Sequence, residues 1–195
     1  LRQFLTTLDG YMQEHWDIIM ESELFQQRTK GIGTITKADA LSFGASGFVL
    51  RASGVDFDVR RDRPYSCYDE IEFDVPVSDG CDVWARAIVR FEEMRQSIRM
   101  MHQVIDGLPE GPIMAEMPRV LRVPAGEAYV PIEAPRGEMG VHLYSDGSDK
   151  PTRVRYRPPT LYHLQIADTI APGNMLADAI VTLGSVDLVL GEVDR

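Results

Sequence analysis

The sequence predicts a helix-rich α+β fold, in which a helical bundle carries a small antiparallel sheet. Two long stretches with apolar residues at intervals of three and four occupy most of residues 1–108. A proline-rich segment follows, and the apolar pattern then changes to short alternating runs typical of strands, with two helical patterns after them. We therefore expect one domain in three parts: a helical part (1–108), a proline-rich strap (109–126), and a small sheet with terminal helices (127–195).

The first 30 residues predict one long amphipathic helix. Its apolar residues recur at helical spacing, so they share one face, which we expect to be buried. The helix should end at Lys30, because a basic last turn and the glycines Gly31 and Gly33 are typical of helix C-termini. The apolar face consists of Leu1, Phe4, Leu5, Leu8, Met12, Trp16 and Ile19.

Thr36 predicts the start of a short helix that loses order near residues 44–47, because a threonine with an acidic residue three positions later resembles a capping box. The next segment, 51–65, contains four arginines and three aspartates. It has two interpretations: a solvated, salt-bridged loop or edge strand, or a loop fixed by buried ion pairs. The charges alternate with apolar residues, which favours the second.

A second long helix is expected to begin at a cap on Asp79 and to end before Pro109. We expect an apolar stripe of Trp84, Ala87, Ile88, Phe91, Met94, Ile98, Met101 and Ile105, with Arg86, Arg90, Glu93 and Arg99 on the opposite side.

Four prolines then hold residues 109–124 in an extended conformation. We interpret this segment as a crossing strap whose apolar residues are buried, namely Ile113, Met114, Met117, Val120 and Leu121.

Three short strands are predicted at 128–132, 139–144 and 152–156, because turn-forming sequences separate them. Helices are expected at 161–170 and 175–184.

The composition limits the function. A formal charge of −10 argues against a nucleic-acid binder that works by neutralising phosphates. Two isolated cysteines, Cys67 and Cys81, form neither a disulfide framework nor a four-thiolate metal site, so a reducing compartment is expected. No apolar run reaches the roughly 20 residues of a membrane-spanning helix, and no signal peptide is expected. The chain begins in helical phase without methionine, so we expect a fragment of a longer protein.

Few residues suggest chemistry by spacing alone. The four histidines (His15, His102, His142 and His163) lie on separate predicted elements, so we expect structural roles and no metal site. Glu133, Arg136 and Glu138 either pin the predicted hairpin as an ion-pair network, or Arg136 reaches a buried anion or cofactor. The final charges, on Asp194 and Arg195, must be paired or hydrated; spacing does not decide between a frayed end and a polar site.

Seven motifs carry a resemblance to a known family, in the right order over nearly the whole chain. They are LRASGVDFDVR, YDEIEFDVP, VRFEEMRQSIR, EAPRGEMGVHLYSDG, RPP, MLAD and the closing GEVDR. With these motifs the chain resembles the D subunit of respiratory complex I, which belongs to the peripheral arm and is similar to the large subunits of nickel–iron hydrogenases. The resemblance implies the hydrogenase-large-subunit fold, with the family's N-terminal half absent from this chain.

The resemblance also implies a function: a peripheral membrane protein on the cytoplasmic side of the cell membrane, within a proton-translocating NADH:quinone oxidoreductase. It forms the quinone-reduction cavity beside the terminal iron–sulfur cluster of a neighbouring subunit. The implied partners are the cluster-bearing B subunit, the C subunit, the membrane-arm subunits and quinone, with NADH bound elsewhere in the complex. This chain itself is expected to bind no cofactor or metal, and the isolated fragment to be inactive.

The implied site residues lie at the chain end. Asp194, Arg195 and Glu192 belong to the GEVDR motif and are expected near quinone and cluster, with Arg51, Glu133, Arg136 and Glu138 as structural ion pairs nearby. The family's headgroup-binding residues lie outside this chain, so no catalytic residue is assigned.

Three alternatives remain. The short strap resembles archaeal relatives, including the equivalent subunit of complexes that pass electrons from a deazaflavin coenzyme to methanophenazine or quinone. A membrane-bound nickel–iron hydrogenase is the second, but the motif of paired cysteines that holds its metals is absent from this sequence. A non-enzymatic assembly or scaffold module is the third, because no redox centre is expected in this chain.

Overall fold

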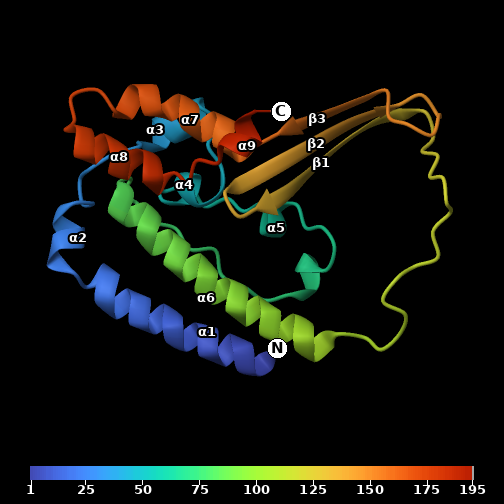
Figure 1. Ribbon diagram of the computed structural model, residues 1–195, viewed down its shortest axis with the longest axis horizontal. Helices are drawn as coiled ribbons and strands as arrows, with labels where there is room; N and C mark the ends of the chain where they lie inside the picture. The colour runs from blue at the N-terminus through green and yellow to red at the C-terminus, as the bar shows by residue number, and fades with distance from the viewer. Residues whose placement is uncertain (195) are drawn as a thin grey trace.

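The computed structural model describes residues 1–194 (Figure 1). Two long helices, α1 (Arg2–His15) and α6 (Val83–Gly107), lie side by side and run antiparallel. Most of the shorter helices lie on the other side of α6, and a three-stranded sheet extends away from them. The predicted helix-rich α+β fold with a small antiparallel sheet is confirmed.

The single long helix predicted for the first 30 residues is wrong, because the helix is interrupted. After α1 the chain forms a π-helical turn, η1 (Trp16–Met20), and then a separate helix, α2 (Glu23–Gln27). The hydroxyl of Ser22 accepts a hydrogen bond from the Phe25 N–H at 3.4 Å and so begins α2 as an N-cap. A serine inside an apolar pattern can offer the backbone this alternative partner, which periodicity does not reveal.

The interface between α1 and α6 is narrower than the apolar pattern predicts. Leu5 and Met12 are buried against Ile98, with Leu8, Phe91 and Ile105 packed around them. Leu1 and Phe4 are exposed, and Ile19 is only partly covered. The prediction that the whole stripe is buried is therefore wrong for these three residues.

The cap of α6 lies three residues later than predicted. Asp82, rather than Asp79, accepts a hydrogen bond from the Ala85 N–H at 2.8 Å. Its other carboxylate oxygen accepts from the Gly31 N–H at 2.7 Å. Asp82 therefore caps the N-terminus of α6 and also holds the loop that contains Gly31 next to the start of this helix.

The assignment of Arg86 to a polar outer side of α6 is also wrong, because α6 packs on two sides. Arg86 is fully buried and donates hydrogen bonds to the carbonyls of Gly33 (2.8 Å) and Cys81 (3.2 Å) and to Ser185 Oγ (2.9 Å). Burial lowers the pKa of its guanidinium to about 10, since no carboxylate bonds to it directly among the described residues.

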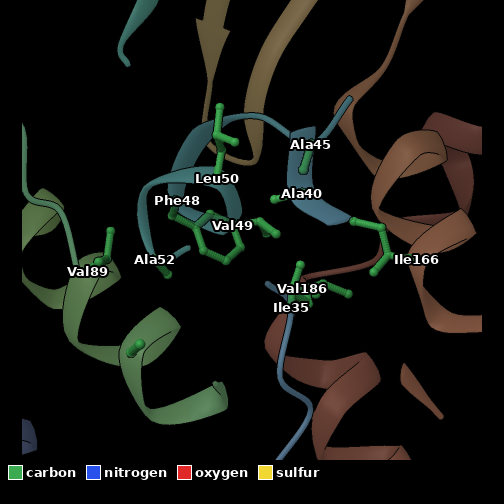
Figure 2. Packing of buried hydrophobic residues seen from close by; sticks show 11 residues of the cluster. Ile35, Ala40, Ala45, Phe48, Val49, Leu50, Ala52, Val89, Ile166 and Val186 are labelled. Atoms are coloured by element: carbon green, nitrogen blue, oxygen red, sulfur yellow. The ribbon is translucent and has the colours of Figure 1, made fainter. Parts of the chain in front are cut away.

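The short helix predicted from Thr36 ends before residues 44–47 as expected, and the main core surrounds the next helix, α4 (Gly47–Arg51) (Figure 2). It packs between α3 (Lys37–Ser42), α6 and the C-terminal helices. The predicted cap at Thr36 is confirmed, since its hydroxyl accepts from the Asp39 N–H at 3.1 Å. The cluster consists of Ile35, Ala40, Ala45, Phe48, Val49, Leu50, Ala52, Ala85, Val89, Ile166 and Val186.

Beyond α4 the chain forms α5 (Val59–Asp62) and a short 3-10 helix, η2 (Tyr68–Glu70), before α6. The charged segment 51–65 is thus partly helical, not an edge strand. Part of its charge is buried and paired, as the interleaved apolar residues indicated.

All three predicted strands are present. They are β1 (Gly126–Ala134), β2 (Gly137–Ser145) and β3 (Arg153–Arg157), antiparallel and in that order across the sheet. Glu133 pairs with Glu138 next to the β1–β2 turn, which consists of Pro135 and Arg136.

The β1–β2 turn is pressed against the start of α4. Gly47 and Gly137 both have positive φ, at 61° and 133°. A Cβ on Gly47 would overlap the backbone of Gly137, and one on Gly137 would overlap Ser46. Ser46 Oγ accepts a hydrogen bond from the Glu138 N–H at 3.0 Å. Only glycine permits this close approach of backbone to backbone.

The strap between α6 and β1 contains neither helix nor strand and follows a wide arc away from the helices (Figure 1). The prediction that its apolar residues are buried is wrong in this structure, because the other described residues leave them largely uncovered. Ile113, Met114, Met117, Val120 and Leu121 are all exposed.

The chain ends with α7 (Pro159–Ile170), α8 (Leu176–Ser185) and the short α9 (Leu190–Val193). Figure 1 places α9 near the base of the sheet. Within residues 1–194, no helix has the length and apolar character needed to cross a membrane.

Replacing Gly137 with alanine should destabilise the protein by about 3 kcal/mol, because the added Cβ clashes with Ser46 in a backbone conformation that disfavours side chains. Urea unfolding measures the change. Gly107→Ala is the control: a Cβ there meets nothing, so a change of under about 0.5 kcal/mol is expected. Equal stability of the two variants would contradict the close approach.

Candidate functional site

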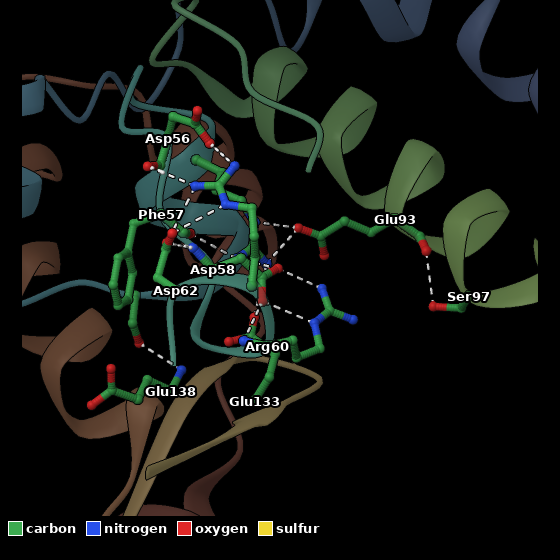
Figure 3. A network of polar contacts seen from close by, with 12 residues as sticks. Asp56, Phe57, Asp58, Arg60, Asp62, Glu93, Ser97, Glu133 and Glu138 are labelled. Atoms are coloured by element: carbon green, nitrogen blue, oxygen red, sulfur yellow. Dashed lines mark hydrogen bonds and ion pairs between the residues drawn. The ribbon is translucent and has the colours of Figure 1, made fainter. Parts of the chain in front are cut away.

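Four elements bring a group of charged side chains together around Arg51, the last residue of α4. Figure 3 shows four of them, Asp58, Arg60, Glu93 and Glu133. We call Arg51, Asp58, Arg60, Glu93 and Glu133 the Arg51 cluster. Asp58 caps α5, Arg60 lies in α5, Glu93 lies on α6 and Glu133 on β1. The cluster therefore joins the helical part of the chain to the sheet.

The guanidinium of Arg51 is buried and reaches an acceptor on each neighbouring element. Its Nε and Nη2 lie 2.7 and 2.6 Å from Glu93 Oε1, and Nη2 also lies 2.9 Å from Glu133 Oε1. Its Nη1 lies 3.2 Å from Asp58 Oδ2 and donates to the Phe57 carbonyl at 3.2 Å. The side chains of Arg51 and Asp58 are 1% and 0% exposed, so these charges depend on each other for solvation.

Arg60 completes the pairing of Asp58. Its Nε and Nη2 donate to the two carboxylate oxygens of Asp58 at 2.9 and 2.6 Å, a bidentate contact. Asp58 also accepts from the Arg60 N–H at 2.9 Å as the cap of α5. The Glu133 N–H donates to Tyr65 Oη at 3.0 Å, which ties β1 to the loop after α5.

Positive and negative charges are unequal in number in the Arg51 cluster, because two guanidinium groups face three carboxylates. Burial alone would raise the pKa of Asp58, but the hydrogen bonds from Arg60 and the charge of Arg51 outweigh it, and that pKa lies below its ordinary value. Burial raises the pKa values of Glu93 and Glu133 above the ordinary range in spite of Arg51. The surplus negative charge therefore rests on the two glutamates.

A cleft of about 340 Å³ opens beside the cluster, between α6 and the β1–β2 hairpin. Its wall includes Arg60, Arg90, Glu93, Ser97 and Glu133. Both glutamates of the Arg51 cluster thus line a space open to solvent, together with Arg60, and their side chains are 18% and 8% exposed.

A second group, the Arg136 cluster, holds the end of the chain. Arg136, in the β1–β2 turn, donates to the Asp187 carbonyl at 3.2 Å and to Glu192 Oε1 at 3.2 Å. Thr160 Oγ1 donates to Glu192 Oε2 at 2.5 Å, and Arg90 donates to Asp187 Oδ2 at 3.0 Å. We define the cluster as these five residues. It fixes α9 against the hairpin, α6 and the start of α7.

The two clusters are connected because both draw residues from α6 and from the β1–β2 hairpin. Arg90 and Glu93 are one turn apart on α6, and Glu133 and Arg136 are three residues apart in the hairpin. Arg90 lies in the wall of the cleft, pairs with Asp187 and stacks on the Phe48 ring at 4.7 Å. A shift of the hairpin would therefore disturb both clusters together.

The structure brings some of the residues predicted from the sequence together in the two clusters and leaves others outside them. Arg51 and Glu133 meet in one cluster, and Arg136 and Glu192 in the other. Within residues 1–194, no ion pair involves the carboxylate of Glu138, whose backbone contributes instead: its carbonyl accepts from Arg157 at 3.1 Å. Asp194 is exposed, with its N–H donating to the Leu190 carbonyl at 3.0 Å, and Arg195 lies outside the described residues.

Sequence reasoning did not single out Asp58, Glu93, Asp187 or Thr160. Asp58 had a signal, since it lies within the segment whose charge was expected to be buried. Glu93 and Asp187 had none, because their partners are 42 and 51 residues distant in the chain. Among the described residues, no group of three or more histidine, cysteine, aspartate or glutamate side chains is arranged to hold a metal ion.

His163 on α7 is fully buried. Its Nε2 accepts a hydrogen bond from the Ser46 N–H at 3.3 Å, so the proton of the neutral ring belongs on Nδ1. Burial lowers the pKa of His163 to about 4, so the ring is neutral at physiological pH. It supports the chain at Ser46, directly before α4 and beside the hairpin turn.

Comparison with known proteins gives one consistent family. The family model described as "Respiratory-chain NADH dehydrogenase, 49 Kd subunit" matches residues 1–121 and 119–195. The break between its two matched parts falls within the strap.

Similar proteins align with the full length of this chain. A protein of Dehalococcoides mccartyi, named as the D subunit of NADH-quinone oxidoreductase, is 47% identical over 195 residues, covering 100% of this chain and 53% of the relative. The protein of the same name from Geobacillus kaustophilus is 44% identical with the same coverage, and that from Geotalea uraniireducens is 39% identical over 220 residues, covering 56% of the relative. The chain spans about half the length of the curated relatives it matches.

Replacing Arg51 with methionine should destabilise the protein by about 3–5 kcal/mol, because three buried carboxylates lose their shared cation. Chemical unfolding measures the loss. Arg61→Met is the matched control: Arg61 pairs with Asp56 and Asp62 at the surface, and a cost below about 1 kcal/mol is expected. A similar cost for both variants would contradict a central role of Arg51.

Acidification should weaken the fold through His163. Its pKa is about 4 when folded and about 6.5 when unfolded, so the unfolded state binds more protons between these values. The contribution, on the order of 3 kcal/mol, is present above about pH 6.5 and is lost as pH falls to about 4. Unfolding experiments across this range should show a flatter pH dependence in His163→Gln, but not in the half-buried control His102→Gln.

Proposed function

The chain belongs to the family of the 49 kDa subunit of respiratory-chain NADH dehydrogenase, and from that membership we propose that it is part of the D subunit of an NADH:quinone oxidoreductase. In this role it contributes to an enzyme as one component of a complex. The observation that carries the proposal is the family match, which extends from residue 1 to residue 195.

Within that complex, we propose that the chain helps to form the cavity in which quinone is reduced. The electrons come from an iron–sulfur cluster in a neighbouring subunit, and this chain itself holds no cofactor. Its partners are the cluster-bearing B subunit, the C subunit and the membrane-arm subunits. The complex couples the reaction to proton translocation, and the chain lies at the cytoplasmic side of the membrane through these partners.

The chain's own contribution is the position of its C-terminal segment. Glu192, Asp194 and Arg195 are proposed to lie next to the quinone and the cluster. The Arg136 cluster supports this proposal, because Arg136 and Thr160 hold both carboxylate oxygens of Glu192. A small hollow of about 240 Å³ adjoins Glu192 between β3, the start of α7 and α9. Hydrogen-bond donors and cations fixed in place stabilise the negative charge that develops on an acceptor during reduction, and Glu192 holds such groups, Arg136 and Thr160, in position.

The Arg51 cluster has a structural part in this proposal. It fixes β1 on α6, and the hairpin that continues from β1 carries Arg136. The position of the chain end therefore depends on buried charges at the other side of the same hairpin turn.

Glu192→Gln in the assembled complex tests the function. The variant keeps the shape of the side chain but loses the charge that Arg136 and Thr160 hold, so α9 is less firmly placed. We expect quinone reduction to fall by about tenfold, which corresponds to about 1.4 kcal/mol of lost transition-state stabilisation, while the complex still assembles. Quinone-dependent NADH oxidation measures the rate.

Glu116→Gln in the exposed strap is the matched control and should leave the rate unchanged. The electron paramagnetic resonance spectrum of the cluster provides a second readout, because a displaced chain end beside it shifts its signals. A Glu192→Gln complex with normal turnover and an unchanged spectrum would overturn the proposed site.

A further inference from the structure

The Arg51 cluster contains more negative than positive charge in a place that is largely shielded from water. Arg51 and Arg60 supply two positive charges, and Asp58, Glu93 and Glu133 supply three negative ones when all are ionised. An unbalanced charge in the interior is costly, and a carboxylate reduces that cost by binding a proton.

The distances show which two carboxylates compete for the same positive charge. Glu93 Oε1 and Glu133 Oε1 lie 2.6 and 2.9 Å from the same atom, Nη2 of Arg51. Two carboxylate oxygens thus lie around a single nitrogen, each within hydrogen-bond distance of it. Two carboxylates in one site do not ionise independently, and one of them retains its proton to a higher pH.

Asp58 is not the proton acceptor. Both of its oxygens accept hydrogen bonds from Arg60, and Arg51 adds a further positive charge at 3.2 Å. Its pKa lies below the ordinary value, because these contacts outweigh its burial. The surplus charge is therefore confined to Glu93 and Glu133, whose pKa values burial raises.

The remaining charges nearby do not balance the surplus. Arg90 lines the same cleft, but its guanidinium is paired with Asp187 and stacked on Phe48. Tyr65 approaches Glu133 only through the backbone N–H that it accepts. The groups facing the two glutamates are thus Arg51 from α4, Asp58 and Arg60 at α5, Arg90 and Ser97 from α6, and Tyr65 from the loop after α5.

We propose that Glu93 and Glu133 share one exchangeable proton, held beside Arg51 Nη2 and exchanged with solvent through the cleft between α6 and the β1–β2 hairpin. When this proton leaves, two ionised carboxylates repel each other between α6 and β1. The cluster is thus a proton-binding site that couples the packing of the hairpin to pH. This inference goes beyond the proposed function and does not depend on it.

Infrared spectroscopy of the protein in its native assembly tests the proposal without using activity. A protonated carboxyl group has a C=O band that an ionised one lacks, and the band shifts in D₂O when its proton exchanges. Difference spectra between the native protein and Glu93→Gln isolate this group. We expect a native band that persists at about pH 6, where ordinary glutamates with a pKa near 4.3 are ionised, and that is absent in Glu93→Gln.

Glu133→Gln should remove the same band, because either substitution balances the remaining charges. Glu92→Gln, on the preceding residue of α6, is the matched control and should keep it, since Glu92 pairs with Arg95 at the surface. If a variant fails to fold, the pH titration of the native band, in H₂O and D₂O, remains decisive. Loss of all carboxyl absorption by about pH 5, or a band unchanged in both glutamine variants, would overturn the proposal.

Discussion

The buried guanidinium of Arg51 is the constraint on which the rest of the structure depends. A charge with 1% exposure needs acceptors from the protein, and no single element of this chain supplies enough of them. Glu93 comes from α6, Asp58 from the cap of α5 and Glu133 from β1. The helical part and the sheet are therefore joined by charge pairing as well as by apolar contact, and the geometry of a guanidinium fixes their relative position more narrowly than apolar packing would.

The sequence predicted the fold well where a local pattern of residues is compatible with only one backbone geometry. The three strands and the cap at Thr36 are examples, because alternation and a capping box each specify a local geometry. The predictions failed where two candidates compete or where tertiary contacts decide. Asp82 caps α6 instead of Asp79, and Arg86 is buried because α6 has neighbours on two sides. Periodicity describes one apolar face and does not report how many partners a helix has.

The candidate site was predictable only in part, for a related reason. Arg51 and Arg136 stand out because each lies in a motif of mixed charge, yet their partners are distant in the chain. The distance from Arg51 to Glu133 is 82 residues, and only the tertiary packing of the hairpin on α4 and α6 brings them together. Glu138 lies directly opposite Glu133 in the register of β1 and β2, but the structure uses its backbone to hold the turn on Ser46 and Arg157. Spacing along the chain does not distinguish these two glutamates.

The exposed strap has a consequence for how the family can vary in length. Closing a loop costs conformational entropy that grows slowly, by about 0.6 kcal/mol for each doubling of its residues. Extra residues within the strap would add that cost alone, because the segment between α6 and β1 forms no helix, strand or apolar core. An insertion of the same size in α6 or in the hairpin would separate Glu93 or Glu133 from Arg51. Insertions in the strap therefore cost little stability, so evolution can lengthen the chain there. The strap is also where the two matched parts of the family model meet.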